Sequence, residues 1–129
     1  VCDVEYDACD LTGDGSRRFR DALFVYARVV SANNDGFVTI DAGSKSLSMD
    51  GPLPLVAFGA PPGATYAGAG DEFGRISLPP GSSSPAIGDL VGLVVPHCDP
   101  TINRFDWYHC VRGDVLTEIW PIEARGCAA

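Results

Sequence analysis

His97 and Asp99 could bind a metal ion, because they lie two positions apart at the end of a valine-rich run, residues 89–96. In an extended strand, residues i and i+2 point to the same face, so both side chains could share one ion while Cys98 points away. An imidazole nitrogen and a carboxylate oxygen suit Mn²⁺, Mg²⁺, Co²⁺ or Zn²⁺. Two protein ligands would leave coordination positions of the ion for water and substrate. Alternatively, both side chains hydrogen-bond the following turn, and Pro100 ends the strand. Spacing alone favours this alternative, since a two-residue motif has low specificity.

Short strands should position these two residues. The 15 glycines and 10 prolines are spread along the chain, and both residue types interrupt helices. Runs of β-branched and aromatic residues between turn residues predict strands at 22–32, 37–41, 55–58, 72–78, 89–96, 107–112 and 115–122. Strands of this length and spacing are typical of a compact antiparallel β-barrel or sandwich, so we expect an all-β fold.

Composition limits the class of protein and its partners. A chain of 129 residues with 46% apolar content is long enough for one domain with a single core. Its net charge of −8 argues against nucleic acid or an anionic membrane as partner. No apolar stretch reaches the roughly 18–20 residues of a membrane helix, and the first residues do not form a secretory signal. Five unevenly spaced cysteines suggest reduced thiols and a cytoplasmic protein.

Four motifs follow one another along the chain: DAGSKSLS at 41–48, GDEFG at 70–74, IGDLV at 87–91 and VPHCDPT at 95–101. In this order they resemble the carboxy-terminal β domain of the D-threonine aldolase and D-serine dehydratase family. That family consists of metal-activated, pyridoxal-phosphate-dependent enzymes of the alanine racemase fold type. The resemblance covers nearly the whole chain, and four ordered motifs are far more specific than any one of them.

The resemblance implies that the chain is one part of a longer enzyme. In the family, a (β/α)₈ barrel binds pyridoxal phosphate, and an all-β domain follows it. The chain starts at Val1 rather than Met, so we expect residues 1–20 to be an irregular segment continuing from the missing barrel and residues 21–129 to be the β domain. Lys45 is the single lysine; it falls in a β-domain motif and not at the cofactor lysine, so an ion pair or turn contact is its expected role. The full enzyme is expected to be a homodimer.

The resemblance also implies roles for individual residues. His97 and Asp99 would bind the divalent metal. The dehydratase branch has a cysteine at the position of Asp99, which favours zinc, whereas a carboxylate favours the aldolase with Mn²⁺ or Mg²⁺, Zn²⁺ being possible. Asp71 is a candidate catalytic residue at the mouth of the active site, although an exposed loop acid is an equal alternative. The aromatic run at 107–109 could line a substrate pocket or belong to the core.

The resemblance implies a lyase that cleaves a D-3-hydroxy amino acid such as D-threonine to glycine and an aldehyde. Without the barrel, this chain alone is expected to be inactive. A D-serine or 3-hydroxyaspartate dehydratase is the first alternative. A second is a non-catalytic β-barrel that serves binding or assembly. A third, a cysteine hydrolase that pairs Cys98 or Cys110 with His97 or His109, is disfavoured because neighbouring residues rarely form a thiol–imidazole hydrogen bond.

Overall fold

The structure is a computed structural model that describes residues 20–127. Within this range the chain forms strands and one short helix, in the order β1 (Phe24–Asn34), β2 (Phe37–Ile40), β3 (Leu55–Phe58), β4 (Thr65–Gly68), β5 (Gly74–Ser77), β6 (Leu90–Val94), α1 (Cys98–Ile102), β7 (Trp107–Arg112) and β8 (Val115–Pro121). The expectations for residues 1–19 lie outside the described part of the chain. Within residues 20–127, no helix is long and apolar enough to cross a membrane.

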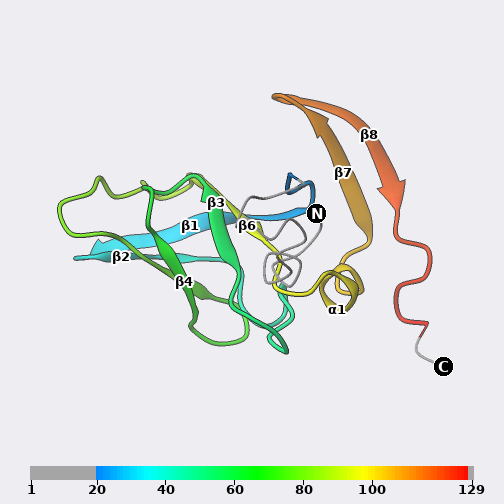
Figure 1. The fold of residues 1–129 in the computed structure, drawn as a ribbon, viewed down its shortest axis with the longest axis horizontal. Helices are drawn as coiled ribbons and strands as arrows, with labels where there is room; N and C mark the ends of the chain where they lie inside the picture. The colour runs from blue at the N-terminus through cyan, green and yellow to red at the C-terminus, as the bar shows by residue number, and fades with distance from the viewer. Residues whose placement is uncertain (1–19, 128–129) are drawn as a thin grey trace, which may run out of the picture.

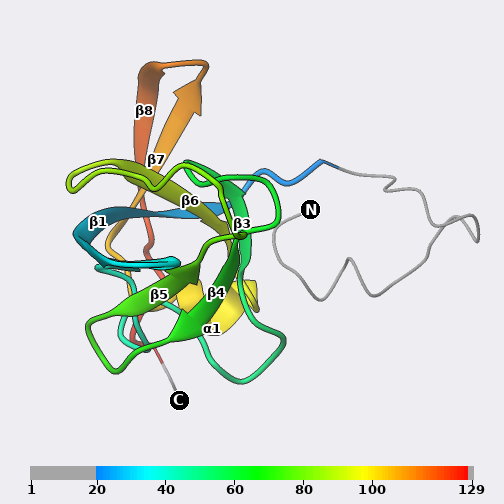
Figure 2. The same ribbon diagram turned by 90° about the vertical axis from the view of Figure 1, so that its left-hand side faces the viewer.

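Six strands form one antiparallel sheet with the order β3-β6-β1-β2-β5-β4. The sheet curls until its two edge strands, β3 and β4, approach each other, which nearly closes a barrel (Figures 1 and 2). The second sheet is the β7–β8 hairpin, which projects away from the barrel in both views. The predicted all-β barrel is therefore confirmed.

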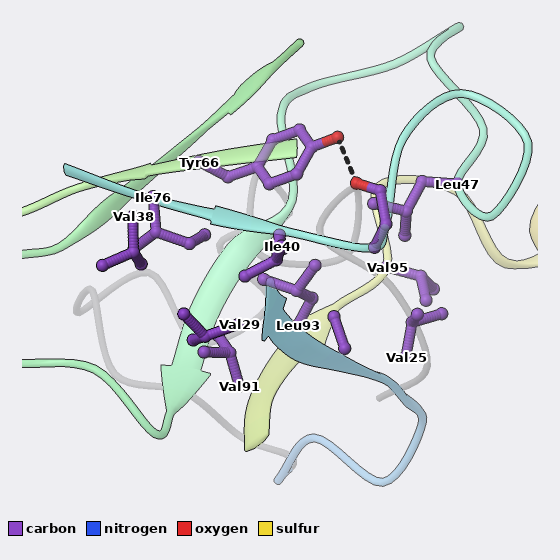
Figure 3. Close-up of a cluster of buried hydrophobic side chains, with 12 residues drawn as sticks. Val25, Val29, Val38, Ile40, Leu47, Tyr66, Ile76, Val91, Leu93 and Val95 are labelled. Atoms are coloured by element: carbon purple, nitrogen blue, oxygen red, sulfur yellow. Dashed lines mark hydrogen bonds between the residues drawn. The ribbon is translucent and has the colours of Figure 1, made fainter. Parts of the chain in front are cut away.

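The core lies inside the curled sheet, and the alternation of side chains along the strands builds it. In β1 the side chains of Val25, Ala27 and Val29 are buried, and the residues between them face outward. Figure 3 shows Val25 and Val29 packed with core side chains of the other strands, namely Val38, Ile40, Tyr66, Ile76, Val91 and Leu93. Each large aliphatic side chain removed from water contributes about 1.5–3 kcal/mol. This packing fixes the register of each strand, because a slip of one residue would expose its core face.

β6 connects the core to the candidate metal residues. Its buried pattern continues past the strand end, since Val95 and Pro96 are also buried. The next residue is His97, so the imidazole emerges where the chain leaves the barrel. A buried strand is the most rigid support that this fold offers, and it fixes the backbone of His97 from one side.

The hairpin differs from the barrel because its large apolar side chains are exposed. Trp107 is 54% exposed and Trp120 is 53% exposed, and His109 is exposed as well. Tyr108 is half-buried. The alternative that the aromatic run at 107–109 belongs to the core is therefore wrong for this chain. No second sheet covers the hairpin among the described residues.

Two elements differ from the sequence-based prediction. β4 was not predicted, because Thr and Tyr favour strands but Ala and Gly do not, and four residues are too few to show a clear pattern. The run at 89–96 was expected to remain extended to its end, but β6 stops at Val94 and α1 starts at Cys98. Pro100 lies inside the first turn of α1, where its missing N–H would have no intrahelical partner in any case. A proline at this position is compatible with a helix as well as with a strand end.

Candidate metal site

The backbone at the site changes direction at His97. His97 is extended, with φ −145° and ψ 122°, and it is the residue before α1, whereas Asp99 lies in the first turn of the helix. The prediction that both residues belong to one extended segment is therefore wrong. The period-2 argument for a shared face does not apply across this boundary, because a helix rotates successive side chains by a different angle. The two residues remain adjacent in space only because they are two positions apart.

The imidazole of His97 pairs with a carboxylate that the sequence analysis did not identify. His97 Nδ1 lies 3.3 Å from Asp50 Oδ2. Asp50 closes the 41–50 loop, which follows β2, and its other oxygen accepts a hydrogen bond from the hydroxyl of Ser48. The side chain of His97 is 32% exposed and that of Asp50 is 57% exposed. The pair therefore lies at the surface, with the imidazole as its more buried member.

Thr101 holds the backbone of His97 from the other side. Its hydroxyl donates to the carbonyl oxygen of His97 at 2.7 Å and accepts from the backbone N–H of Ser48 at 3.1 Å. Thr101 is 1% exposed and Ser48 is 2% exposed, so the bond between them is shielded from water, whereas the bond to His97 is partly buried. A buried polar group without a partner is costly, and each group here has one. The 41–50 loop and α1 are thus joined directly beneath the imidazole.

Asp99 is exposed, and its carboxylate contacts the neighbouring thiol. Cys98 Sγ donates to Asp99 Oδ1 at 3.2 Å. The prediction that Cys98 points away from Asp99 is wrong, because residues 98 and 99 lie in a helix and not in a strand. Among the described residues, Cys98, Cys110 and Cys127 form no disulfide.

The donor types of His97 and Asp99 fit a divalent cation, since an imidazole nitrogen and a carboxylate oxygen suit Mn²⁺, Mg²⁺ or Zn²⁺. A carboxylate on Nδ1 is also the usual companion of a metal-binding histidine. Residues 20–127 contain no group of three or more His, Cys, Asp or Glu that could hold an ion. The described chain therefore supplies at most two ligands, and further ligands must come from elsewhere.

A second polar cluster joins the 41–50 loop to the 69–73 loop, which connects β4 and β5. Ser44 Oγ donates to Asp71 Oδ1 at 2.9 Å, and Lys45 forms an ion pair with Glu72. Hydrogen bonding and charge from Glu72 raise the pKa of Lys45 above its ordinary value. The ion pair predicted for Lys45 is confirmed. Asp71 is exposed and is held by Ser44, so its catalytic role stays a prediction.

Gly43 permits the two loops to approach each other. A Cβ at this position would lie 2.5 Å from the carbonyl oxygens of Gly70 and Asp71, which is too close for any side chain. Without a side chain there, the N–H groups of Ser44 and Lys45 reach those same two oxygens, at 3.2 Å and 3.0 Å. The glycine of the DAGSKSLS motif is thus explained by backbone packing.

Arg104 connects this second cluster to α1. Its guanidinium donates to the carbonyl oxygen of Ser44 at 3.3 Å and to that of Pro100 at 2.6 Å. The 41–50 loop therefore contacts two segments that are distant from it in the sequence: the 69–73 loop, through Ser44 and Lys45, and α1, through Ser48. The order of the four motifs along the chain gave no indication of these contacts. Only the acidic character of Asp50 and its place just after DAGSKSLS could have suggested it as a partner.

Comparison with known proteins gives one family. Residues 22–111 match the family described as "Putative serine dehydratase domain". Among curated proteins, the chain is 41% identical over 113 residues to D-threonine aldolase from Arthrobacter sp., which covers 88% of this chain and 29% of that protein. It is 36% identical over 108 residues to 3-hydroxy-D-aspartate aldolase from Paracoccus denitrificans, which covers 84% of this chain and 27% of that protein.

The fold comparison agrees with the sequence comparison. The crystal structure of D-threonine aldolase from Filomicrobium marinum matches with a TM-score of 0.85 and 36% identity, over 98% of this chain and 34% of that one. D-threo-3-hydroxyaspartate dehydratase from Delftia sp. HT23 shares the fold, with a TM-score of 0.65 and 20% identity, over 91% of this chain and 35% of that one. The chain thus spans about a third or less of the length of these relatives.

Proposed function

Because the chain belongs to the serine dehydratase domain family, we propose that it is the metal-binding β domain of a pyridoxal-phosphate-dependent lyase. Both curated relatives described above are aldolases, and their names indicate that they cleave D-3-hydroxy amino acids. We assign D-threonine, or a related D-3-hydroxy amino acid, as the substrate and glycine plus an aldehyde as the products. The proposal places the enzyme in the cytoplasm as a homodimer.

One observation carries the metal part of the proposal: the imidazole of His97 has a carboxylate, that of Asp50, at its Nδ1. This is the arrangement in which a histidine commonly binds a metal through its other ring nitrogen. Asp99 would supply an oxygen ligand from the first turn of α1. An oxygen ligand at position 99 favours a hard ion such as Mn²⁺ or Mg²⁺ over the softer Zn²⁺.

In the proposed mechanism, this chain contributes binding and orientation. His97 and Asp99 would hold the cation at the end of β6, on a backbone that Thr101 and the buried strand make rigid. The bound cation would supply Lewis-acid activation of the substrate's 3-hydroxyl group. The cofactor would supply the electron sink for cleavage of the Cα–Cβ bond. A catalytic role for Asp71 is part of the proposal, and Ser44 would orient its carboxylate.

The isolated chain should lack lyase activity. A Schiff-base enzyme needs a nucleophilic lysine, and Lys45, the single lysine of the sequence, is paired with Glu72. The relatives extend well beyond the length that this chain covers. We therefore assign cofactor binding, and the group that takes the proton from the substrate, to a barrel domain outside this chain.

A dehydratase is the second candidate. The family description favours it, and the same activated hydroxyl could leave instead of losing its proton. The carboxylate at position 99 and the higher identity to aldolases support the aldolase instead. A third candidate is a non-catalytic binding module, in which His97 and Asp99 bind no metal.

The test is calorimetric titration of the chain with Mn²⁺, in the native protein and in the variants His97→Ala and Asp99→Ala. His109→Ala is the matched control, because it removes the other histidine, which lies on the exposed hairpin. We expect weak binding that is lost in the first two variants and kept in the control. Equal heats in all four proteins would reject the metal site and leave the non-catalytic module as the better account.

A further inference from the structure

Asp50 lies 47 positions before His97 and outside the motifs that suggested the metal site, yet its carboxylate contacts the imidazole. We propose that Asp50 is a positioning residue, which fixes the orientation and the tautomer of the His97 ring. The effect of Asp50 on metal binding rests on the function proposed above. The effect on the ring itself is a property of this chain and can be measured without any metal.

The two oxygens of Asp50 have different partners. Oδ2 lies 3.3 Å from Nδ1 of His97, and Oδ1 accepts the hydroxyl proton of Ser48. The second bond orients the carboxylate, because a hydrogen bond to one oxygen restricts rotation about the Cβ–Cγ bond. Ser48 is buried, so it can hold Asp50 in place although the carboxylate is largely exposed.

The network then closes on the backbone of the same histidine. The N–H of Ser48 donates to Thr101 Oγ1, and Thr101 donates in turn to the carbonyl oxygen of His97. Ser48 therefore takes part in two hydrogen bonds of this network: its hydroxyl group orients Asp50, and its backbone N–H is fixed by Thr101. The ring and the carbonyl group of His97 are held by one continuous chain of hydrogen bonds. Such an arrangement restricts the imidazole more than a single surface pair could.

A carboxylate at Nδ1 selects one tautomer of a neutral imidazole. The carboxylate only accepts hydrogen bonds, so it favours the ring form that carries its proton on Nδ1. The lone pair is then on Nε2, and this is the nitrogen that would act as a ligand. Loss of such a partner typically weakens metal binding by about 10–100-fold. Asp50 is not assigned as a ligand, because residues 20–127 contain no three-residue group suited to an ion.

The experiment is ¹⁵N NMR of the histidine ring nitrogens in the metal-free chain, at about pH 8, where an ordinary imidazole is neutral. The ring signals of the two histidines are assigned with His97→Ala, and His109 serves as the internal reference. In the native chain we expect His97 to carry its proton on Nδ1. In Asp50→Ala the signals should move toward the mixture seen for His109, whereas Asp50→Asn, which keeps an acceptor oxygen, should fall between.

The control is Asp35→Asn, because Asp35 is exposed in the turn between β1 and β2 and its replacement changes the net charge by the same amount as Asp50→Asn. It should leave the His97 signals unchanged. Backbone spectra of each variant verify that the fold is intact, which separates a local effect on the ring from unfolding. Unchanged His97 signals in a folded Asp50→Ala would overturn the proposal.

Mn²⁺ titration of the same variants separates this proposal from the proposed function. If both hold, Asp50→Ala should lower the affinity about 10–100-fold, with Asp50→Asn intermediate and Asp35→Asn unaffected. If the tautomer depends on Asp50 but the native chain binds no Mn²⁺, the positioning role is supported and the metal function is rejected. If Mn²⁺ binds equally well to the native protein and to Asp50→Ala, Asp50 has no positioning role toward the metal.

Discussion

The buried hydroxyl of Thr101 lies 2.7 Å from the carbonyl oxygen of His97. Its second bond, to the N–H of Ser48, makes Thr101 the link between α1 and the 41–50 loop. The position of the imidazole therefore depends on a residue that carries no charge and would bind no metal. This relationship gives the first prediction.

Thr101→Val should destabilise the chain by about 1–3 kcal/mol, because it preserves the shape of the side chain but leaves the buried N–H of Ser48 without its partner. Urea unfolding measures this change. Thr117→Val is the matched control, since Thr117 donates a comparable bond to the carbonyl oxygen of Cys110 on the exposed hairpin. Equal stability of the two variants would show that the Thr101 bonds are not important for the fold.

Gly43→Ala should also be destabilising, by about 1–3 kcal/mol, because the new methyl group would overlap the backbone of the 69–73 loop. The loops must separate to admit it, so the bond between Ser44 and Asp71 should weaken as well. Gly68→Ala is the control: its Cβ would meet only the flexible end of Met49, at 3.5 Å. Thermal unfolding of both variants tests the prediction, which fails if Gly43→Ala is as stable as the control.

The sequence predicts the barrel better than it predicts the site, and the reason is physical. Alternating burial along a strand is a local property, so the run 24–34 is visible without the fold, and the short apolar run 90–94 indicates a strand buried on both faces. The contact between Asp50 and His97 depends on how the barrel closes, and local spacing contains no information about it. The same holds for α1, because Pro100 is compatible with both a strand end and a first helical turn.

Tyr66→Phe should lower the free energy of unfolding by about 1 kcal/mol. The phenol of Tyr66 is buried and donates to the carbonyl oxygen of Ala42 at 2.9 Å. The dashed line from Tyr66 in Figure 3 marks this bond. This bond attaches the start of the 41–50 loop to β4. The phenylalanine variant leaves the carbonyl group without its partner, and urea unfolding at neutral pH measures the cost.

The same tyrosine predicts a pH dependence. Burial raises the pKa of Tyr66 above its ordinary value of 10.0, so the folded state favours the neutral phenol. Its contribution to stability is complete below pH 10.0 and is lost as the pH rises through the raised pKa. The stability of the native chain should therefore fall more steeply with alkaline pH than that of Tyr66→Phe. Parallel pH profiles of the two proteins would contradict this assignment.

Glu72→Gln should make Lys45 a better nucleophile. An amine attacks a carbonyl only in its neutral form, and Glu72 raises the pKa of Lys45 above its ordinary value of 10.5. The ion pair is thus complete at neutral pH and is lost as the pH rises through this raised pKa. At a fixed pH of about 9, below the ordinary lysine pKa, removal of the carboxylate increases the neutral fraction of the amine.

Reductive methylation with formaldehyde measures this difference, since Lys45 is the single lysine and mass spectrometry separates its peptide from the amino terminus. We expect faster modification of Lys45 in Glu72→Gln than in the native chain. Glu118→Gln, which removes a carboxylate of the hairpin that pairs with Trp120, should react like the native chain. Equal rates of methylation in the native chain and both variants would mean that the ion pair does not lower the reactivity of the Lys45 amine. The inactivity proposed for the isolated chain would then rest on the absent barrel alone, because Lys45 would be as reactive as any exposed lysine.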